Sequence, residues 1–347
     1  MDRERYINGI AVLEPEGAMA PVYRAATPYV VHLTAGSFSW RKAIAGWRHA
    51  IRDFQPDLVM LYGSRANLIG RLTSFGAGAA IVSGLRSVSA DERNSRAAIW
   101  LDRLTFSRVS ICVANSSAAL ERFADCGFPK DRLVHIPSGI DVARFASVDR
   151  QSARASFGLR QNDFVVLCVA NLKPVKNHRT LLEGFAGLNG RGRRLLLWLV
   201  GDGPERPELE RLAGALGIAD RVVFCGEEVG PVARYIAADA FALASHFEGL
   251  PTSVLEAMAA GVPVVASGVG DVPALLEGDS GIVLAPPVTA AALQQALQRL
   301  IDDDGLRARQ AQRGRQRAAA FDWRVTVRRY EELLSGVAAA RARGRAA

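Results

Sequence analysis

The sequence predicts an α/β protein with two domains, each built around a parallel β-sheet. Short apolar segments alternate with longer segments of helical periodicity along most of the 347 residues, which is typical of parallel sheets with right-handed crossover connections. The chain is long enough to bury two hydrophobic cores. A turn-forming segment, residues 136–145, separates two such alternating series.

The first series begins with PYVVHL at residues 28–33, a run rich in β-branched and aromatic residues. The segment from Trp40 to Phe54 then repeats apolar residues at helical spacing and ends before Pro56. Further apolar runs that we interpret as strands lie at residues 57–62, 79–83, 111–114 and 133–136. Segments of helical character lie between them at residues 67–75, 97–109 and 116–126.

In the second series, each predicted strand runs into a turn that carries glycine or charged residues. These strands lie at residues 164–169, 195–200, 222–224, 240–244 and 263–266. Because ligands of open α/β sheets bind beyond the carboxyl ends of the strands, we expect these turns to surround a binding site. An amphipathic helix at residues 290–301 and a final helix at 321–334 complete the series.

The stretch HFEGLPTSVLEAMAAGVPVV, residues 246–265, carries two carboxylates with seven residues between them. Glu248 precedes a turn, whereas Glu256 lies on a short helix that ends at Gly261. Ser253 and Glu256 have the spacing of a capping box, and that role alone would explain Glu256. The unpaired N–H groups of such a helix start, together with the helix dipole, also favour an anionic ligand.

The net charge of +8 is unevenly distributed along the chain. Residues 1–150 hold 19 Lys and Arg against 14 Asp and Glu, and the tail 337–347 adds three arginines. The basic first half indicates either a solvated surface or a face that docks on anionic lipid headgroups. Nucleic acid is not an expected partner, because the basic residues form no stripe interleaved with aromatic residues.

The cysteines and histidines show no metal-binding or disulfide pattern. The four cysteines each lie in or beside an apolar run, which favours buried thiols in a reducing cytoplasm: Cys112, Cys126, Cys168 and Cys225. The sequence has neither an apolar run of about eighteen residues nor the apolar core of a signal peptide at its start. We therefore expect a cytoplasmic protein, associated with the inner face of the cell membrane if the basic face binds lipid.

The two-carboxylate stretch closely resembles the E-x7-E region of the retaining nucleotide-sugar glycosyltransferases of GT-B fold, family 4, also called group 1. The resemblance implies that Glu256 holds the ribose hydroxyls of the donor and that Glu248 lies beside the donor sugar. The segment ANLKPVKNH at residues 170–178 resembles the family turn whose Arg and Lys neutralise the donor diphosphate. Lys176 stands at the Lys position, Asn171 replaces the Arg, and Lys173 is a candidate to supply the missing charge.

The same resemblance assigns further binding residues and the domain boundaries. The backbone at Gly249, Leu250, Pro251 and Thr252 is expected to face the diphosphate, and the turns at Gly201, Gly226 and Glu227 are expected to lie near the donor. The implied fold is two Rossmann-like domains whose parallel sheets face a cleft. We expect an acceptor-side domain at 1–147, a donor-binding domain at 148–321, a helix returning to the first domain at 322–336 and a disordered tail at 337–347.

The first domain departs from the family pattern. Family members begin with a strand and a glycine-rich loop that faces the donor diphosphate, whereas residues 1–30 show no such loop. The resemblance therefore runs from about residue 28 to residue 335, and we expect the first domain to be clipped at its start. A cleft histidine that follows the strand at 57–62 in many members is also absent, since Tyr62-Gly63-Ser64-Arg65 stands there.

The resemblance implies a glycosyltransferase that takes a UDP-sugar, retains the anomeric configuration and needs neither a metal nor another cofactor. The expected acceptor is a glycan or lipid-linked intermediate of bacterial polysaccharide or cell-envelope biosynthesis. Two alternatives stay open: a nucleotide-sugar epimerase of similar fold, and a truncated binder of sugar nucleotides without catalytic activity. An assay with a panel of nucleotide-sugars separates the three.

Overall fold

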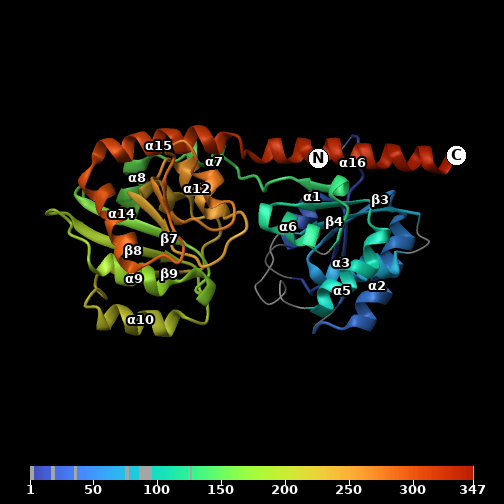
Figure 1. The fold of residues 1–347 in the computed structure, drawn as a ribbon, viewed down its shortest axis with the longest axis horizontal. Helices are drawn as coiled ribbons and strands as arrows, with labels where there is room; N and C mark the ends of the chain where they lie inside the picture. The colour runs from blue at the N-terminus through green and yellow to red at the C-terminus, as the bar shows by residue number, and fades with distance from the viewer. Residues whose placement is uncertain are drawn as a thin grey trace. The chain divides into compact units, whose positions relative to one another are not determined.

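The computed structural model describes residues 4–16, 20–34, 37–74, 78–85, 96–125 and 127–346. The chain forms two compact units, of which unit 1 comprises residues 1–137 and 327–347 and unit 2 comprises residues 138–326. The division after Pro137 lies before the boundary expected near residue 147, because the short helix that follows the junction packs with unit 2. Each unit has the α/β architecture with parallel strands that the sequence predicts (Figure 1).

Unit 2 is built on a six-stranded parallel sheet with the strand order β12-β11-β10-β7-β8-β9. The strands are β7 (Asp163–Val169), β8 (Arg194–Val200), β9 (Val222–Gly226), β10 (Ala240–Leu243), β11 (Val264–Ser267) and β12 (Ile282–Leu284). The inner strands are continuous apolar runs and are buried on both faces, as is typical of a parallel sheet covered by helices. The predicted strands of this half are confirmed.

The helices of unit 2 cover both faces of its sheet. On one face α9 packs against α10 and α14, and α8 and α12 lie on the other (Figure 1). The helix α11 packs against both α8 and α12. The helices and 3-10 turns are α7 (Ala143–Ala146), α8 (Arg150–Ser156), η3 (Pro174–Lys176), α9 (His178–Ala186), α10 (Arg206–Ala215), α11 (Val232–Ala237), α12 (Thr252–Ala260), α13 (Val272–Leu275), α14 (Ala290–Asp302) and α15 (Asp304–Ala319). One large apolar cluster runs through all these layers. This core fixes the strand ends on which the candidate site is built.

The strands of unit 1 form two separate parallel sheets in the described residues. A two-stranded sheet pairs β1 (Gly9–Val12) with β2 (Tyr29–His32), and a four-stranded sheet has the order β3-β4-β5-β6. The latter strands are β3 (Leu58–Tyr62), β4 (Ala80–Leu85), β5 (Ile111–Ala114) and β6 (Leu133–His135). No strand was predicted before residue 28, and β1 with the helix α1 (Ala20–Ala26) corrects this. The short strand β1 is only half-buried and gives no strong apolar run.

Alternate residues of β3 separate the two faces of the four-stranded sheet. Val59 and Leu61 point into a cluster with Trp47 and Ile51 of α2, whereas Leu58 and Met60 pack in the cluster that includes α16. The helices and 3-10 turns of unit 1 are α1, α2 (Trp40–Phe54), α3 (Ser64–Thr73), α5 (Arg96–Thr105), η1 (Phe106–Arg108), α6 (Ser117–Asp125) and η2 (Lys130–Arg132). The helix α16 (Trp323–Ala346) begins in unit 2 and continues into unit 1.

The tail predicted to be disordered, residues 337–347, is instead helical as far as Ala346. Val337 is buried against the sheet, and the Nε atom of Arg341 donates to the carbonyl of Gly78 at 2.7 Å. These contacts extend the helix beyond the predicted end near Leu334. Among the described residues, no helix is long and apolar enough to cross a membrane.

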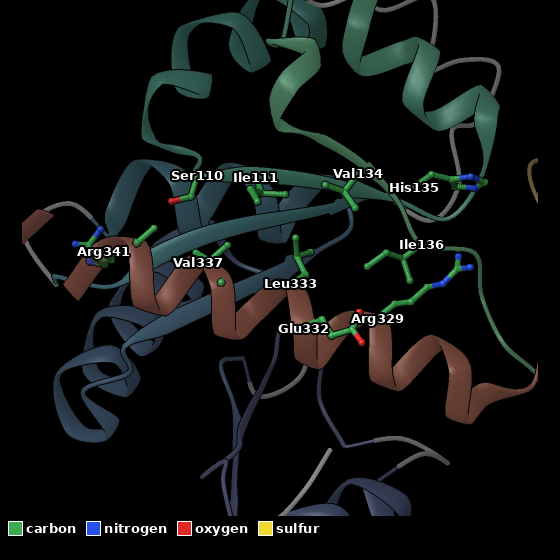
Figure 2. Close-up of a pocket in the computed structure, with 12 residues that line it drawn as sticks. Ser110, Ile111, Val134, His135, Ile136, Arg329, Glu332, Leu333, Val337 and Arg341 are labelled. Atoms are coloured by element: carbon green, nitrogen blue, oxygen red, sulfur yellow. The ribbon is translucent and has the colours of Figure 1, made fainter. Parts of the chain in front are cut away.

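A groove of about 790 Å³ lies in unit 1 between α16 and the strands β5 and β6 (Figure 2). Its walls are mainly apolar and include Ile111, Val134 and Leu333, while Arg329 and His135 lie at one end. None of the residues predicted to bind or transform a substrate lines this groove. Of the cysteines, Cys112 and Cys168 are buried thiols as expected, Cys225 is partly buried, and Cys126 lies outside the described residues.

Candidate functional site

The turns that follow β7, β8 and β9 are packed tightly at the carboxyl-end edge of the unit 2 sheet. A Cβ atom at Gly201 would lie 2.2 Å from the carbonyl oxygen of Ala170, and one at Gly203 would lie 2.4 Å from that of Leu172. Gly201 also donates its N–H to the carbonyl of Gly226 at 2.8 Å, with φ values of 134° and 73° at the two glycines. Only glycine permits this approach and these backbone angles. The turns therefore form a fixed rim of backbone groups.

Lys176 and Glu248 are brought together at this edge from two different strand ends. The Lys176 Nζ atom lies 2.6 Å from Glu248 Oε1, and the Ser245 Oγ atom donates to the same oxygen at 2.6 Å. Glu248 is 7% exposed, so its charge is removed from bulk water and compensated by the lysine. Gly270 packs over the carboxylate segment, because a Cβ atom there would lie 2.3 Å from the carbonyl oxygen of Glu248.

Two buried groups lie close to this ion pair. The side chain of His178, 1% exposed, has its Nε2 atom 3.8 Å from Cys168 Sγ. Burial, and then the nearby Lys176 charge, lower the pKa of His178 to about 4. Burial raises the pKa of Cys168 to about 12. The charge of Lys176 lowers this pKa by a smaller amount, and the charge of Glu248 raises it. Both side chains are therefore neutral at pH 7, and the charge at this point belongs to Lys176 and Glu248.

The start of α12 differs from the capping box that the sequence predicts. The helix begins at Thr252 with Pro251 as N-cap, and no side chain caps it. Because the helix begins before Ser253, Glu256 is too far along to reach the N-cap backbone, and the capping-box interpretation is wrong. The predicted end is confirmed, since Gly261 has φ 72° and donates to Met258. Among the described residues, no group accepts the N–H of Thr252 or Ser253, so the first turn keeps free donors.

Glu256 instead accepts a hydrogen bond from Tyr235 of the neighbouring helix α11. The Tyr235 hydroxyl lies 2.8 Å from Glu256 Oε2, and the tyrosine ring is fully buried. Burial raises the pKa of Glu256, and the Tyr235 hydrogen bond and the charge of Arg144 oppose that rise. Burial, followed by the charge of Glu256, raises the pKa of Tyr235, so the hydroxyl keeps its proton and acts as the donor.

The remaining predicted residues lie on the same edge with fewer contacts. Asn171 and Lys173 are exposed on the turn after β7, and no described residue pairs with the Lys173 ammonium group. Glu227 is exposed after β9, next to Gly226. Gly249 accepts the N–H of Asp271 at 2.9 Å, and Leu250 is buried beneath it. His246, which the sequence placed near the site without a role, is exposed.

Two residues that contact the carboxylates, Ser245 and Tyr235, were not predicted from the sequence. Ser245 stands three residues before Glu248, directly after a predicted strand, and a polar residue at that point is the signal that could have singled it out. Tyr235 is far from Glu256 in sequence and lies in an apolar helix, so no pattern in the chain connects the two.

Two family models match the chain. Residues 10–144 match Glycosyltransferase Family 4, and residues 149–317 match Glycosyl transferases group 1. Together the two matches cover both units.

Curated relatives are similar over one half to three quarters of this chain. The lipopolysaccharide core biosynthesis glycosyltransferase LpsE of Rhizobium meliloti is 29% identical over 77% of this chain and 72% of its own length. The GDP-mannose-dependent alpha-(1-6)-phosphatidylinositol monomannoside mannosyltransferase of Mycolicibacterium smegmatis is 35% identical over 62% of this chain and 59% of its own length. The D-inositol 3-phosphate glycosyltransferase of Salinispora arenicola is 35% identical, and the match spans about half of that relative, 48%.

Solved structures show the same fold over nearly the whole chain. The complex of Anabaena HepE with UDP and glucose has a TM-score of 0.83 at 24% identity and covers 94% of this chain and 91% of its own. The lipopolysaccharide glycosyltransferase WaaG has a TM-score of 0.72 at 17% identity, with coverages of 96% and 92%. The fold, the matched residues and the relatives agree with the resemblance drawn from the sequence: the chain belongs to the group 1 glycosyltransferases and has their two-domain GT-B fold.

Proposed function

We propose that the chain transfers a sugar from a nucleotide-sugar donor, with retention of anomeric configuration, to a glycan or lipid-linked acceptor of bacterial cell-envelope biosynthesis. The observation that carries this proposal is the cluster of Lys176, Glu248 and Ser245 at the carboxyl-end edge of the unit 2 sheet. It combines a cation for a phosphate with a carboxylate for sugar hydroxyls at the position where open α/β sheets bind ligands.

The diphosphate leaving group carries about two negative charges, which this edge is suited to neutralise without a metal. Among the described residues, the ammonium of Lys176 contacts Glu248 and keeps two N–H donors for phosphate oxygens. Lys173, exposed on the same turn, takes the place of the charge that Asn171 lacks. The free N–H groups of Thr252 and Ser253 add the positive end of α12. Preorganised donors of this kind commonly contribute ~3 kcal/mol each to transition-state stabilisation.

The two carboxylates divide the recognition of the donor in this proposal. Glu256 accepts from the ribose hydroxyls, and Glu248 accepts from a hydroxyl of the transferred sugar and keeps Lys176 in place. The backbone at Gly201, Gly226 and Glu227 borders the nucleotide. Gly249, Leu250 and Pro251 guide the chain into the first turn of α12, where the phosphates bind.

A uridine nucleotide is the donor that we propose. In its support, HepE, which shares the fold, has been crystallised with UDP, with UDP and glucose, and with UDP-glucose. A guanosine nucleotide is the competing donor, since the Mycolicibacterium relative is named as GDP-mannose-dependent. The choice is open to a direct binding measurement with UDP and GDP.

The acceptor belongs to unit 1 in this proposal, at the inner face of the cell membrane. Support comes from α2, whose exposed residues include Arg41, Lys42, Arg48 and Arg52 together with the 46% exposed Trp40. A basic helix face with an exposed tryptophan suits anionic lipid headgroups. Relatives named for lipopolysaccharide and phosphatidylinositol mannoside synthesis agree with a lipid-linked acceptor.

A panel of UDP- and GDP-sugars, incubated with the purified chain with and without extracted lipid-linked acceptors, tests the proposal. A glycosyltransferase releases UDP or GDP and moves the sugar to the acceptor with the donor's anomeric configuration. Conversion of one nucleotide-sugar into its epimer would establish the epimerase alternative. Binding without turnover of any donor would establish the nonenzymatic binder.

A further inference from the structure

We propose that the buried hydroxyl groups of Ser245 and Tyr235 are positioning elements, each of which holds one oxygen of a site carboxylate so that the other oxygen is left for the nucleotide-sugar. This inference rests on the proposed function, because it assigns the free oxygens to that donor. It adds two residues that the motif does not contain, and it gives each a role that can be measured separately from folding.

Ser245 controls which oxygen of Glu248 is available. The Ser245 side chain, 2% exposed, and the Lys176 ammonium both bond to Oε1, each at 2.6 Å. Among the described residues, nothing bonds to Oε2, so this oxygen can accept a hydroxyl of the ligand. Without Ser245 the carboxylate could rotate and present both oxygens to Lys176, which would remove the free acceptor.

The backbone that carries Ser245 is itself held in place. Asn177 donates from Nδ2 to the carbonyl of Ala244 at 3.2 Å, directly before Ser245, and Thr180 donates to Asn177 Oδ1 at 2.9 Å. Both partners lie at the start of α9, which follows Lys176. The lysine and the serine that share Oε1 are thereby connected through a second set of hydrogen bonds, which keeps the three side chains in one arrangement.

Tyr235 has the same relation to Glu256. Its hydroxyl donates to Oε2 at 2.8 Å, and among the described residues nothing bonds to Oε1. The tyrosine ring is fully buried and packs against Phe145 and Phe241, with ring centroids at 5.8 and 6.0 Å. Because this packing holds the ring in place, the carboxylate must adjust to the hydroxyl. One oxygen of Glu256 is fixed and the other is oriented before the ligand arrives.

The Tyr235 hydrogen bond predicts a specific pH dependence for nucleotide binding. The groups near Glu256 are Tyr235 from α11 and Arg144 from α7, and Cys168 of β7 lies near Tyr235. From α15, Arg315 lies at the far end of α12 against Gly261. The hydroxyl favours the ionised carboxylate, so its removal raises the pKa of Glu256 further. As the pH is lowered, a variant without this hydroxyl therefore loses its affinity for a ribose at a higher pH than the wild type does.

The first experiment measures the affinity for UDP between pH 5 and 8 by calorimetry for the wild type and Tyr235→Phe. We expect the acid loss of affinity to move upward by about 1 pH unit, with affinities within about threefold at pH 8. Tyr29→Phe is the control, since it removes a hydroxyl that bonds to Asp53 in unit 1. The phosphate of UDP titrates equally in all three proteins. Superimposable profiles for wild type and Tyr235→Phe would overturn the role of Tyr235.

The second experiment compares Ser245→Ala with the control Ser267→Ala. Ser267 is a buried serine, 1% exposed, at the end of the neighbouring strand β11, and its hydroxyl donates to the Leu243 carbonyl. The nucleotide-sugar used is whichever of UDP-glucose, UDP-N-acetylglucosamine and GDP-mannose the wild type binds most tightly. The readout is the affinity for this nucleotide-sugar divided by the affinity for its free nucleoside diphosphate. We expect Ser245→Ala to lower this ratio about tenfold and Ser267→Ala to leave it unchanged. Equal ratios for both variants would overturn the role of Ser245.

The two ways of failing are distinguishable. If the wild type binds neither UDP nor GDP nor any sugar derivative of them, the proposed function fails and the inference falls with it. If the wild type binds and both variants behave as their controls do, the inference alone is wrong.

Discussion

Glu256 places a negative charge in a partly buried position where burial already disfavours it. Glu256→Gln removes that charge but keeps an oxygen that accepts from Tyr235, so the melting temperature should change little. The amide is the poorer partner for ribose hydroxyls, and UDP affinity should fall by roughly 1–3 kcal/mol. Calorimetry and thermal unfolding measure the two effects. A lowered melting temperature with unchanged UDP affinity would show that Glu256 serves only the fold.

His178 makes the stability of unit 2 depend on pH. Its pKa is lowered from 6.5 to about 4 by burial and by Lys176, so the unfolded chain takes up a proton below about pH 6.5 that the folded chain takes up only near pH 4. Stability therefore falls as the pH drops through this window, by ~2 kcal/mol between pH 7 and 4.5. In urea unfolding, His178→Gln should lose less free energy of unfolding than the wild type between pH 7 and 4.5, and the difference should equal this amount. Parallel losses in both proteins would contradict the assignment.

At the scale of residues, motif position was more informative than local chemistry. Lys176 and Glu248 were predicted to lie near each other, and they form an ion pair at 2.6 Å, while their roles toward a donor stay predictions. The capping box failed because Thr252 and Ser253 are equally suited to begin a helix, and α12 begins at Thr252 with Pro251 as its N-cap. Tyr235 could not be predicted, because its contact with Glu256 depends on two helices that meet only in the folded unit.

The turn that follows β11 packs closely against the segment that carries Glu248. Gly270 has φ 56°, and a Cβ atom there would lie 2.3 Å from the carbonyl oxygen of Glu248. Gly270→Ala should therefore destabilise unit 2 by about 2–3 kcal/mol and displace the Glu248 segment. Gly278→Ala is the matched control, since φ is 66° and a Cβ atom meets nothing within 4 Å. It should cost about 1 kcal/mol. Equal losses in chemical unfolding would contradict the close packing of the two turns.

Elements with a strong periodic signal were predicted well. The long apolar strands of unit 2 and the amphipathic α14 lie within a few residues of their predicted bounds. The short β1 was missed because it has only four residues and none of them is buried. The tail from residue 337 was misjudged because its alanines and arginines give little apolar pattern, whereas contacts of Val337 and Arg341 with the rest of unit 1 keep it helical.

At the scale of the whole molecule, the uneven charge predicts lipid binding through α2. The purified chain should sediment with vesicles rich in phosphatidylglycerol and not with vesicles of phosphatidylcholine alone. Since each basic residue near such a surface contributes about 1 kcal/mol, the double variant Arg41→Glu, Arg48→Glu should bind at least ~30-fold more weakly. The control is the double variant Arg309→Glu, Arg315→Glu on α15 of unit 2, which should bind the vesicles as the wild type does. Equal losses for both variants would leave no specific role for α2.

The central claim is that the strand-end edge of unit 2 binds a nucleoside diphosphate through Lys176. Calorimetric titration of UDP and GDP into the wild type and Lys176→Ala tests it most directly, with thermal unfolding measured in parallel. We predict that the wild type binds one of the two nucleotides and that Lys176→Ala weakens this binding by about 1.5–3 kcal/mol, since one charge-assisted contact is lost. The change in melting temperature reports separately on the loss of the ion pair with Glu248. An unchanged dissociation constant for the nucleotide that the wild type binds would contradict the account.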